Sequence, residues 1–270
     1  MVYAVLALAP APAVASPQAT EWVRYTHSEV RMVRGIVRAD GAVEMGVQVK
    51  LSPGWKTYWR VPGDSGVPPD FNWSRSANVR DIDVLWPTPS RFRDQFGDNI
   101  GYKDEVLFPL VVMPGDGTKP LTVKMNLNYA VCADVCVPVQ ADLSLDIPMQ
   151  SVWPRHAAEI ARYMRLVPKP PEEVSGLKVA AVTVDRTGKR PELIVDVTCE
   201  DPARPMDLFV EGDQSLFFGV PAETASDVGG RKRFRIPVDS SAGDAALKSG
   251  ELRFVVVDGD KRLAQTWLLQ

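Results

Sequence analysis

Short runs of alternating apolar and polar residues recur along the chain and restrict it to a strand-based fold. The clearest run is LTVKMNLNY at residues 121–129, where Leu121, Val123, Met125 and Leu127 alternate with polar side chains. A period of two buries one face of a strand and leaves the other in water, as in an antiparallel sheet. Because 23 prolines and 19 glycines are spread along the 270 residues, such runs stay short and are separated by turns. The pattern predicts an all-β protein.

Further strands are predicted on both sides of the middle of the chain. In the first half they cover residues 29–38, 42–51, 79–86, 105–112 and 139–147. In the second half they cover residues 177–185, 191–198, 232–238, 251–257 and 262–269. The dipeptide Asp40-Gly41 separates the first two strands, and Asp-Gly between alternating runs is a strong signal for a hairpin turn.

One helix is predicted between these two groups of strands. At residues 154–166, apolar side chains recur at i, i+3, i+4 and i+7 from Ala157 and therefore share one helical face. The Pro-rich segment PKPPEEVSG at residues 168–176 follows and is typical of a linker. We therefore predict two β-sandwich domains, at residues 21–167 and 176–270.

The beginning of the chain predicts export. Its first residues are apolar and then small, and Ala13-Val14-Ala15 has the A-x-A form of a signal-peptidase cleavage site. We interpret residues 1–20 as a signal peptide or a disordered tail. No later apolar run reaches the roughly 20 residues that a membrane helix needs, so we expect a soluble, periplasmic protein.

Composition excludes several other functional classes. The net charge is -3 and no cluster of Lys and Arg is present, so we expect no nucleic-acid partner. Only two histidines occur, which argues against a zinc site. We expect no metal, no cofactor and no small-molecule ligand.

Two of the three cysteines, Cys132 and Cys136, form the most specific chemical feature. In one continuous strand their Cα atoms would lie about 13 Å apart, at about 3.3 Å per residue, which is too far for a disulfide. The intervening Ala-Asp-Val would have to turn, and Asp134 is a natural turn residue. We predict a hairpin tip closed by a Cys132–Cys136 disulfide, with Cys199 left as a buried free thiol.

Three interpretations of this pair remain open: reversible disulfide exchange, a static structural disulfide, and binding of a soft metal such as Cu(I). So short a loop gains little entropy from closure, which favours exchange over a structural role. No Lys, Arg or His lies between Lys124 and Arg155, and the charge of Asp134 disfavours a thiolate. We expect a passive pair whose reactivity is supplied by the thiolate of a partner.

Three segments resemble one family. They are PGWKTYWRVPGDSG at 53–66, LWPTPSRFRDQFGDNIGYKDEVLFPL at 85–110 and NYAVCADVCVP at 128–138. Together they are similar to the amino-terminal periplasmic domain of the thiol:disulfide interchange protein DsbD, and to the related suppressor-of-copper-sensitivity B proteins. The resemblance implies an immunoglobulin-like sandwich that carries both cysteines on adjacent strands. We extend the same sandwich fold to the second domain.

The resemblance also implies an activity and partners. In the family, the pair accepts electrons from a membrane-embedded domain and reduces periplasmic thioredoxin-like or disulfide isomerase proteins, in cytochrome c maturation or copper tolerance. The chain would then be one component of a protein-disulfide reductase. The 270 residues include no counterpart of the family's membrane domain, so we expect a separate membrane electron donor. The alternative is a non-catalytic binding module with a structural disulfide.

The family pattern assigns site residues as well. It implies that Cys136, the more accessible cysteine, forms the mixed disulfide with the partner. The capping loop maps to residues 93–97, with Phe96 as the nearest aromatic residue. Tyr58 and Lys56 match positions that line the family's active site. We add Tyr102 and Asp134 to this lining because they lie in the matching segments.

Overall fold

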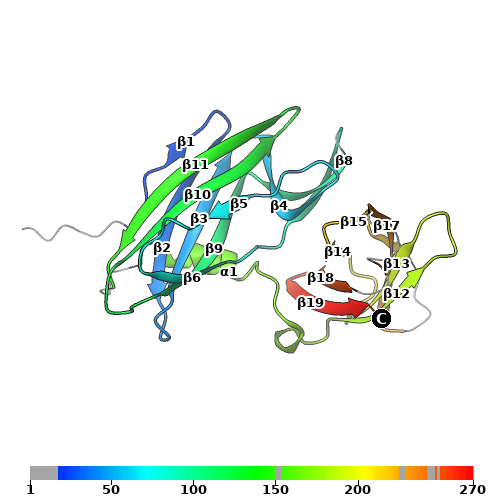
Figure 1. The fold of residues 1–270 in the computed structure, drawn as a ribbon. Coiled ribbons are helices and arrows are strands. Elements are labelled where there is room, and N and C mark those ends of the chain that lie inside the picture. The colour runs from blue at the N-terminus through cyan, green and yellow to red at the C-terminus, as the bar shows by residue number, and fades with distance from the viewer. Residues whose placement is uncertain are drawn as a thin grey trace, which may run out of the picture.

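The computed structural model describes residues 18–95, 97–149, 154–224, 229–241, 247 and 250–269, and these residues are mostly in strands (Figure 1). The all-β prediction is confirmed. The strands of the first half are β1 (Val23–Arg24), β2 (Ser28–Val37), β3 (Val43–Leu51), β4 (Lys56–Gly63), β5 (Asp70–Asn72), β6 (Val79–Val84), β7 (Ser90–Asp94), β8 (Gly97–Lys103), β9 (Glu105–Pro114), β10 (Leu121–Cys132) and β11 (Cys136–Ile147). The remaining strands are β12 (Lys178–Asp185), β13 (Glu192–Thr198), β14 (Met206–Glu211), β15 (Leu216–Phe218), β16 (Ala222–Thr224), β17 (Arg231–Ser240), β18 (Gly250–Asp258) and β19 (Lys261–Leu269).

The first half of the chain forms a sandwich of two sheets. One sheet has the strand order β1-β2-β3-β9-β6, and the other has the order β11-β10-β4-β8-β7 with β5 attached to β10. Alternation places Leu121, Val123, Met125 and Leu127 of β10 in the core between the sheets. All neighbouring strands are antiparallel, which agrees with the period-two pattern.

The second half of the chain forms another pair of sheets. Strands β12-β13-β17-β15 make one sheet, with β16 attached to β17, and β14-β18-β19 make the other. Their shared core contains Val195, Val197, Phe234, Ile236 and Phe254. Figure 1 shows this sandwich beside the first one, with β14 and β18 on the side that faces β4 and β8.

Helix α1 (Ala157–Met164) is shorter than the predicted 154–166. Its buried residues are Ile160 and Tyr163. Ile160 and the partly buried Met164 lie on the predicted face and pack against the core, and Tyr163 lies outside that prediction. The helix packs against β2, β3 and β9, and the Ile160 side chain fills the space left by Gly35. None of the helices within the described ranges is long and apolar enough to cross a membrane.

The predicted linker at 168–176 is attached to the second sandwich rather than extended in water. The Lys169 amide donates to the Arg262 carbonyl at 2.8 Å, and the Ala264 amide donates to the Lys169 carbonyl at 2.7 Å. A short 3-10 helix, η1 (Pro171–Glu173), follows, and Val174 is buried in the second core. The linker is therefore hydrogen-bonded to β19 from its second residue, Lys169.

The predicted signal peptide falls mostly on residues 1–17, which lie outside the described part of the chain. The last residues of the predicted tail, 18–20, hydrogen-bond to β2. The Thr20 amide donates to the Met32 carbonyl at 2.9 Å, and the Arg34 amide donates to the Gln18 carbonyl at 2.8 Å. The regular pairing of the first sheet thus begins a few residues before position 21.

Candidate redox site

The two cysteines close the tip of the β10–β11 hairpin. Residues pair along both strands from Leu121–Ile147 to Cys132–Cys136, and the last pair is joined by a disulfide as predicted. Their Cα atoms lie 4.1 Å apart. Cys132 is 0% exposed, whereas Cys136 is exposed. A partner can therefore approach Cys136 far more easily than Cys132.

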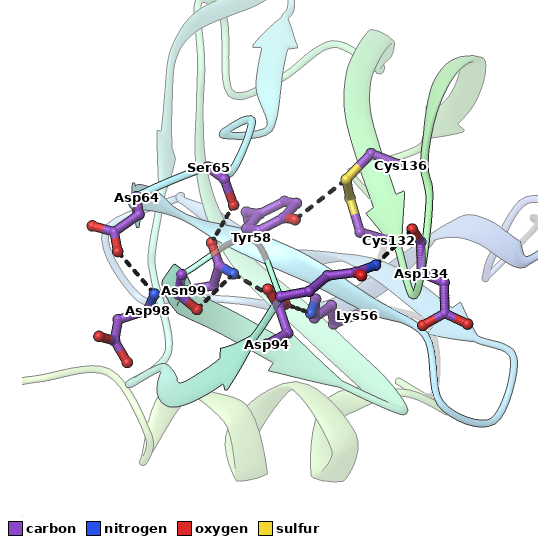
Figure 2. A network of polar contacts seen from close by, with 12 residues as sticks. Lys56, Tyr58, Asp64, Ser65, Asp94, Asp98, Asn99, Cys132, Asp134 and Cys136 are labelled. Atoms are coloured by element: carbon purple, nitrogen blue, oxygen red, sulfur yellow. Dashed lines mark hydrogen bonds and ion pairs between the residues drawn. A yellow bond between two sulfur atoms is a disulfide. The ribbon is translucent and has the colours of Figure 1, made fainter.

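The turn between the cysteines presents its side chains to solvent. The Ala133 amide donates to the Val135 carbonyl at 3.0 Å, which closes the turn. Asp134 is exposed, and its side chain extends away from the two sulfur atoms (Figure 2). Its charge is therefore screened by water and acts only weakly on a thiolate. Val135 is 60% exposed and places an apolar side chain beside Cys136.

Tyr58 lies on β4, and its side chain reaches the disulfide at Cys136. Its hydroxyl lies 3.7 Å from the Sγ atom of Cys136 (Figure 2). Because a disulfide sulfur carries no hydrogen, the phenol is the donor. Burial, followed by the nearby charge of Asp94, raises the pKa of Tyr58 above its ordinary value. The phenol therefore stays protonated and remains a donor at physiological pH.

Two glycines allow the Tyr58 ring to be enclosed. A Cβ atom at Gly66 would overlap the ring carbons of Tyr58. A Cβ atom at Gly101, on β8, would lie 2.8 Å from the Cα atom of Tyr58 and would overlap the Thr57 carbonyl. Both positions need glycine because the backbone approaches Tyr58 too closely for a side chain.

Lys56 lies next to Cys132 in the sheet, since the two residues are paired across β4 and β10. Its ammonium group forms an ion pair with the Asp94 carboxylate and lies 5.0 Å from the ring centroid of Phe92. The Asn99 amide also donates to Asp94, at 3.1 Å. The Lys56 ammonium group thus comes from the residue paired with buried Cys132, but its charge is already neutralised by the Asp94 carboxylate.

The loop that the family resemblance assigns as a cap is the tip of the β7–β8 hairpin. Asp94 pairs with Gly97, so the hairpin turns between these two residues, and Gln95 lies in the turn. The Gln95 side-chain amide donates to the Asp134 carbonyl at 3.1 Å and connects this loop to the cysteine loop. Phe96 lies outside the described residues.

Asp64 holds this hairpin close to its tip. Its carboxylate accepts a hydrogen bond from the Asp98 amide at 2.9 Å, and its own amide donates to the Asp98 carbonyl at 3.0 Å. Gly97 has a φ of +116° and packs directly on the Asp64 side chain. The segment that follows β4 therefore positions the loop next to the disulfide.

Tyr102 is not brought to this site. Its hydroxyl donates to the Pro87 carbonyl at 2.8 Å, and its ring packs edge-on against Phe108 at 5.4 Å. Full burial raises the pKa of Tyr102 well above its ordinary value. Tyr102 is therefore a core residue, and its assignment to the site lining was wrong.

The polar contacts of Asp94, Gln95 and Asn99 near the disulfide were not predicted. Asp94 and Gln95 fall within the predicted capping loop at 93–97 but were given no individual role, and Asn99 lies outside that loop. Asn99 is 0% exposed, accepts from the Ser65 hydroxyl at 2.9 Å and donates to Asp94. Several polar residues in one short segment, RDQFGDN, are the only signal that could have indicated them.

Cys199 is a buried free thiol on the second sandwich, as predicted. Burial first and the charge of Asp258 second raise its pKa. Such a thiol reacts slowly. Within the described residues, no group of three or more His, Cys, Asp and Glu side chains is arranged to hold a metal ion.

Comparisons with known proteins agree with this geometry. Residues 29–148 match the family model of the N-terminal domain of the thiol:disulfide interchange protein DsbD. Residues 166–269 match a family described as a domain of unknown function (DUF8393). No curated protein matches the chain.

A solved structure resembles nearly the whole chain. It is the N-terminal periplasmic domain of ScsB from Proteus mirabilis, with 28% sequence identity and a TM-score of 0.74. The alignment covers 94% of this chain and 99% of that one. The first sandwich, with its disulfide at the tip of the β10–β11 hairpin, therefore belongs to the family of the DsbD N-terminal domain.

Proposed function

We propose that the chain passes reducing equivalents to partner proteins through reversible opening of the Cys132–Cys136 disulfide. The family match identifies a thiol–disulfide exchange module. The observation that carries the proposal is the unequal exposure of the two cysteines. Exposed Cys136 lies beside the Tyr58 hydroxyl, and buried Cys132 is paired with Cys136 across β10 and β11. One sulfur is thus open to a partner, and the other is held ready to displace it.

The exchange involves two electrons and two protons. In the reduced form, the Cys136 thiolate attacks a partner disulfide, one partner sulfur leaves as a thiolate, and a mixed disulfide forms. Cys132 then loses its proton and attacks the Sγ atom of Cys136. The Cys132–Cys136 disulfide re-forms, and the partner is released as a dithiol. Reduction by the electron donor runs through the same steps in reverse.

The family suggests the class of partner. DsbD-family domains interact with thioredoxin-like proteins, so thioredoxin-like or disulfide isomerase proteins are the proposed electron acceptors. The ScsB relative is a periplasmic domain, which supports the proposal that this chain is exported. A separate membrane protein is the proposed electron donor.

We assign the exchange chemistry to residues 21–167 and propose that residues 176–270 form a second unit. Cys132 and Cys136 are the reacting groups. Tyr58, Lys56 and Asp134 surround them in the proposed site, and Phe96 is the proposed cap. A ring over the disulfide would exclude small thiols, and a docking partner could displace it.

Trapping of the mixed disulfide tests the proposal. Cys132→Ser protein keeps the exposed Cys136 thiol but cannot release a partner, so protein purified from the periplasm should carry a thioredoxin-like protein bound through Cys136. Cys136→Ser protein is the matched control and should carry far less, because Cys132 is buried. Both variants are made with Cys199→Ala, so that no other thiol can react.

The opposite outcome would indicate a structural disulfide. Structural disulfides have reduction potentials below about −300 mV. A potential in that range, together with the absence of any trapped partner, would overturn the proposal. Capture of partners by the Cys136→Ser variant instead would reverse the roles of the two cysteines.

A further inference from the structure

Strand β4 interrupts its pairing with β8 directly after Tyr58. Tyr58 pairs with Gly101, and the next paired position is Gly63, opposite Asn99. Residues 59–62 therefore lie opposite a single residue of β8 and form a large bulge in the strand. The β4–β8 ladder holds the backbone of Tyr58 opposite Gly101 but does not fix the bulge that begins at the next residue, so the placement of residues 59–62 depends on other contacts.

The second sandwich supplies those contacts through β14. The Arg60 guanidinium binds the Glu211 carboxylate with two hydrogen bonds, Nε to Oε2 and Nη2 to Oε1, each 2.6 Å long. The ring of Trp59 packs against Phe209 with ring centroids 5.8 Å apart. Phe209 is 1% exposed and packs in the core of the first sandwich, although it belongs to the second.

The same strand also contacts the β7–β8 hairpin. Arg91, on β7, donates to the Leu208 carbonyl at 3.0 Å, and its guanidinium lies 5.2 Å from the Phe209 ring centroid. Leu208, Phe209 and Glu211 are all residues of β14. One strand of the second sandwich thus contacts both elements of the first sandwich that approach the disulfide.

We propose that β14 is a positioning element for the redox site. It holds the bulge of β4 and thereby keeps the Tyr58 hydroxyl directed at the Sγ atom of Cys136. Arg60 and Glu211 are the positioning residues, and both act through Tyr58. The inference rests on the proposed exchange function for its purpose, because it gives the second sandwich a role in that site.

The ion pair is well suited to this task. A bidentate Arg–carboxylate pair fixes direction as well as distance. The Arg60 and Glu211 side chains are only 23% and 15% exposed. Loss of Glu211 leaves the Arg60 charge poorly solvated, whereas loss of Arg60 leaves Glu211 with a longer contact of 3.9 Å to Arg253. Loss of either partner releases the bulge from β14, so that the bulge can move. Tyr58 is two residues away on the same strand and shifts relative to the sulfur.

The pKa of the Cys136 thiol reports the position of Tyr58 in chemically reduced protein. Arg60→Met removes the charge and keeps most of the side-chain stem. We expect it to raise the pKa of the Cys136 thiol by about half a unit, which is about a threefold loss of thiolate at neutral pH. The pKa is measured from the pH dependence of iodoacetamide labelling of Cys136, resolved by peptide mass spectrometry.

Two further variants test whether the effect runs through this ion pair and through Tyr58. Glu211→Gln should raise the pKa by a similar amount, and the double variant with Arg60→Met should add nothing to either single change. In a Tyr58→Phe background, Arg60→Met should have no effect on the pKa. Glu211→Gln also provides an independent measurement where Arg60→Met fails to fold.

A matched ion pair provides the control. Arg233 binds Asp196 with two hydrogen bonds of 2.7 and 2.9 Å, and both residues lie within the second sandwich. Asp196→Asn should lower stability without changing the pKa of Cys136. The inference is overturned if Arg60→Met lowers stability and leaves the pKa unchanged, or if it shifts the pKa equally in the Tyr58→Phe background. These measurements need no physiological partner, so a failure of the trapping experiment is a separate result.

Discussion

The hydroxyl group of Tyr58 lies 3.7 Å from the Sγ atom of Cys136. The Tyr58 side chain is buried, with Gly66 packed against its ring and Gly101 packed against its backbone. A donor held in this way can stabilise negative charge on one sulfur in preference to the other. The hydrogen bond thus distinguishes Cys136 from Cys132 chemically, in addition to the difference in exposure.

Removal of this donor should raise the pKa of the Cys136 thiol. A hydrogen bond to a charged group contributes about 1.5 kcal/mol or more, so Tyr58→Phe should raise that pKa by about one unit. Because the pKa of Tyr58 is raised above 10.0, the phenol remains a donor throughout the range in which the thiolate forms. The shift is measured in chemically reduced protein from the pH dependence of iodoacetamide labelling of Cys136, resolved by peptide mass spectrometry. An unchanged titration curve would show that Tyr58 only packs beside the disulfide.

Reduction of the disulfide should weaken the fold only modestly. The loop that it closes is short, with a sequence separation of 4, and the loop-entropy relation gives a stabilisation of about 2 kcal/mol. The paired strands β10 and β11 continue to Leu121 and Ile147, so the hairpin keeps its register without the disulfide. Urea unfolding of oxidised and reduced protein measures the difference. Complete unfolding on reduction would instead favour a structural disulfide.

Lys56 and Asp94 should stabilise the fold only when both charged partners are present. Their side chains are 8% and 19% exposed, so removal of one partner leaves a charge that is largely shielded from water. Lys56→Met should lower the free energy of unfolding by about 3 kcal/mol. The double variant Lys56→Met with Asp94→Asn should lose less than the two single losses combined. Additive losses in urea unfolding would show that the two charges do not depend on each other.

The Gln95 side chain should slow the access of small thiols to the disulfide. Its single hydrogen bond to the Asp134 carbonyl joins the two loops in a partly solvated place, so Gln95→Ala should speed reduction by glutathione about threefold. Gln140→Ala is the matched control, because Gln140 lies on β11 of the disulfide hairpin and its side chain donates to Asn126 instead of joining the two loops. Equal rates for the wild type and both variants would contradict the prediction.

The proposed cap at Phe96 has a related test. Phe96→Ala should speed reduction by glutathione more than it changes stability, since a covering ring blocks small thiols without supporting the core. A large loss of stability without faster reduction would make Phe96 an ordinary packing residue. Neither result would affect the assignment of the Cys132–Cys136 pair, which stands on its own geometry.

Strands with a regular period of two could be predicted from sequence, and irregular strands could not. Strand β10 alternates from Leu121 to Tyr129 and was predicted over this range, whereas its last three residues, all buried, were missed. Strand β4 contains Pro62 and ends at Gly63, and its bulge at residues 59–62 removes the alternation. Strand β14 lies in a segment without alternating side chains. The strands missed by the sequence analysis therefore include β4, which carries Tyr58, and β14, which contacts the first sandwich.

The sequence by itself determined the all-β class and the hairpin that carries Cys132 and Cys136. Both follow from interactions between neighbours along the chain, namely strand alternation and a short turn. Only the tertiary structure decided which side chains surround the disulfide and that β14 contacts the bulge of β4. Those contacts join residues such as Arg60 and Glu211, which are 151 positions apart. They depend on the register of several strands at once and on one bulge, which no local pattern specifies.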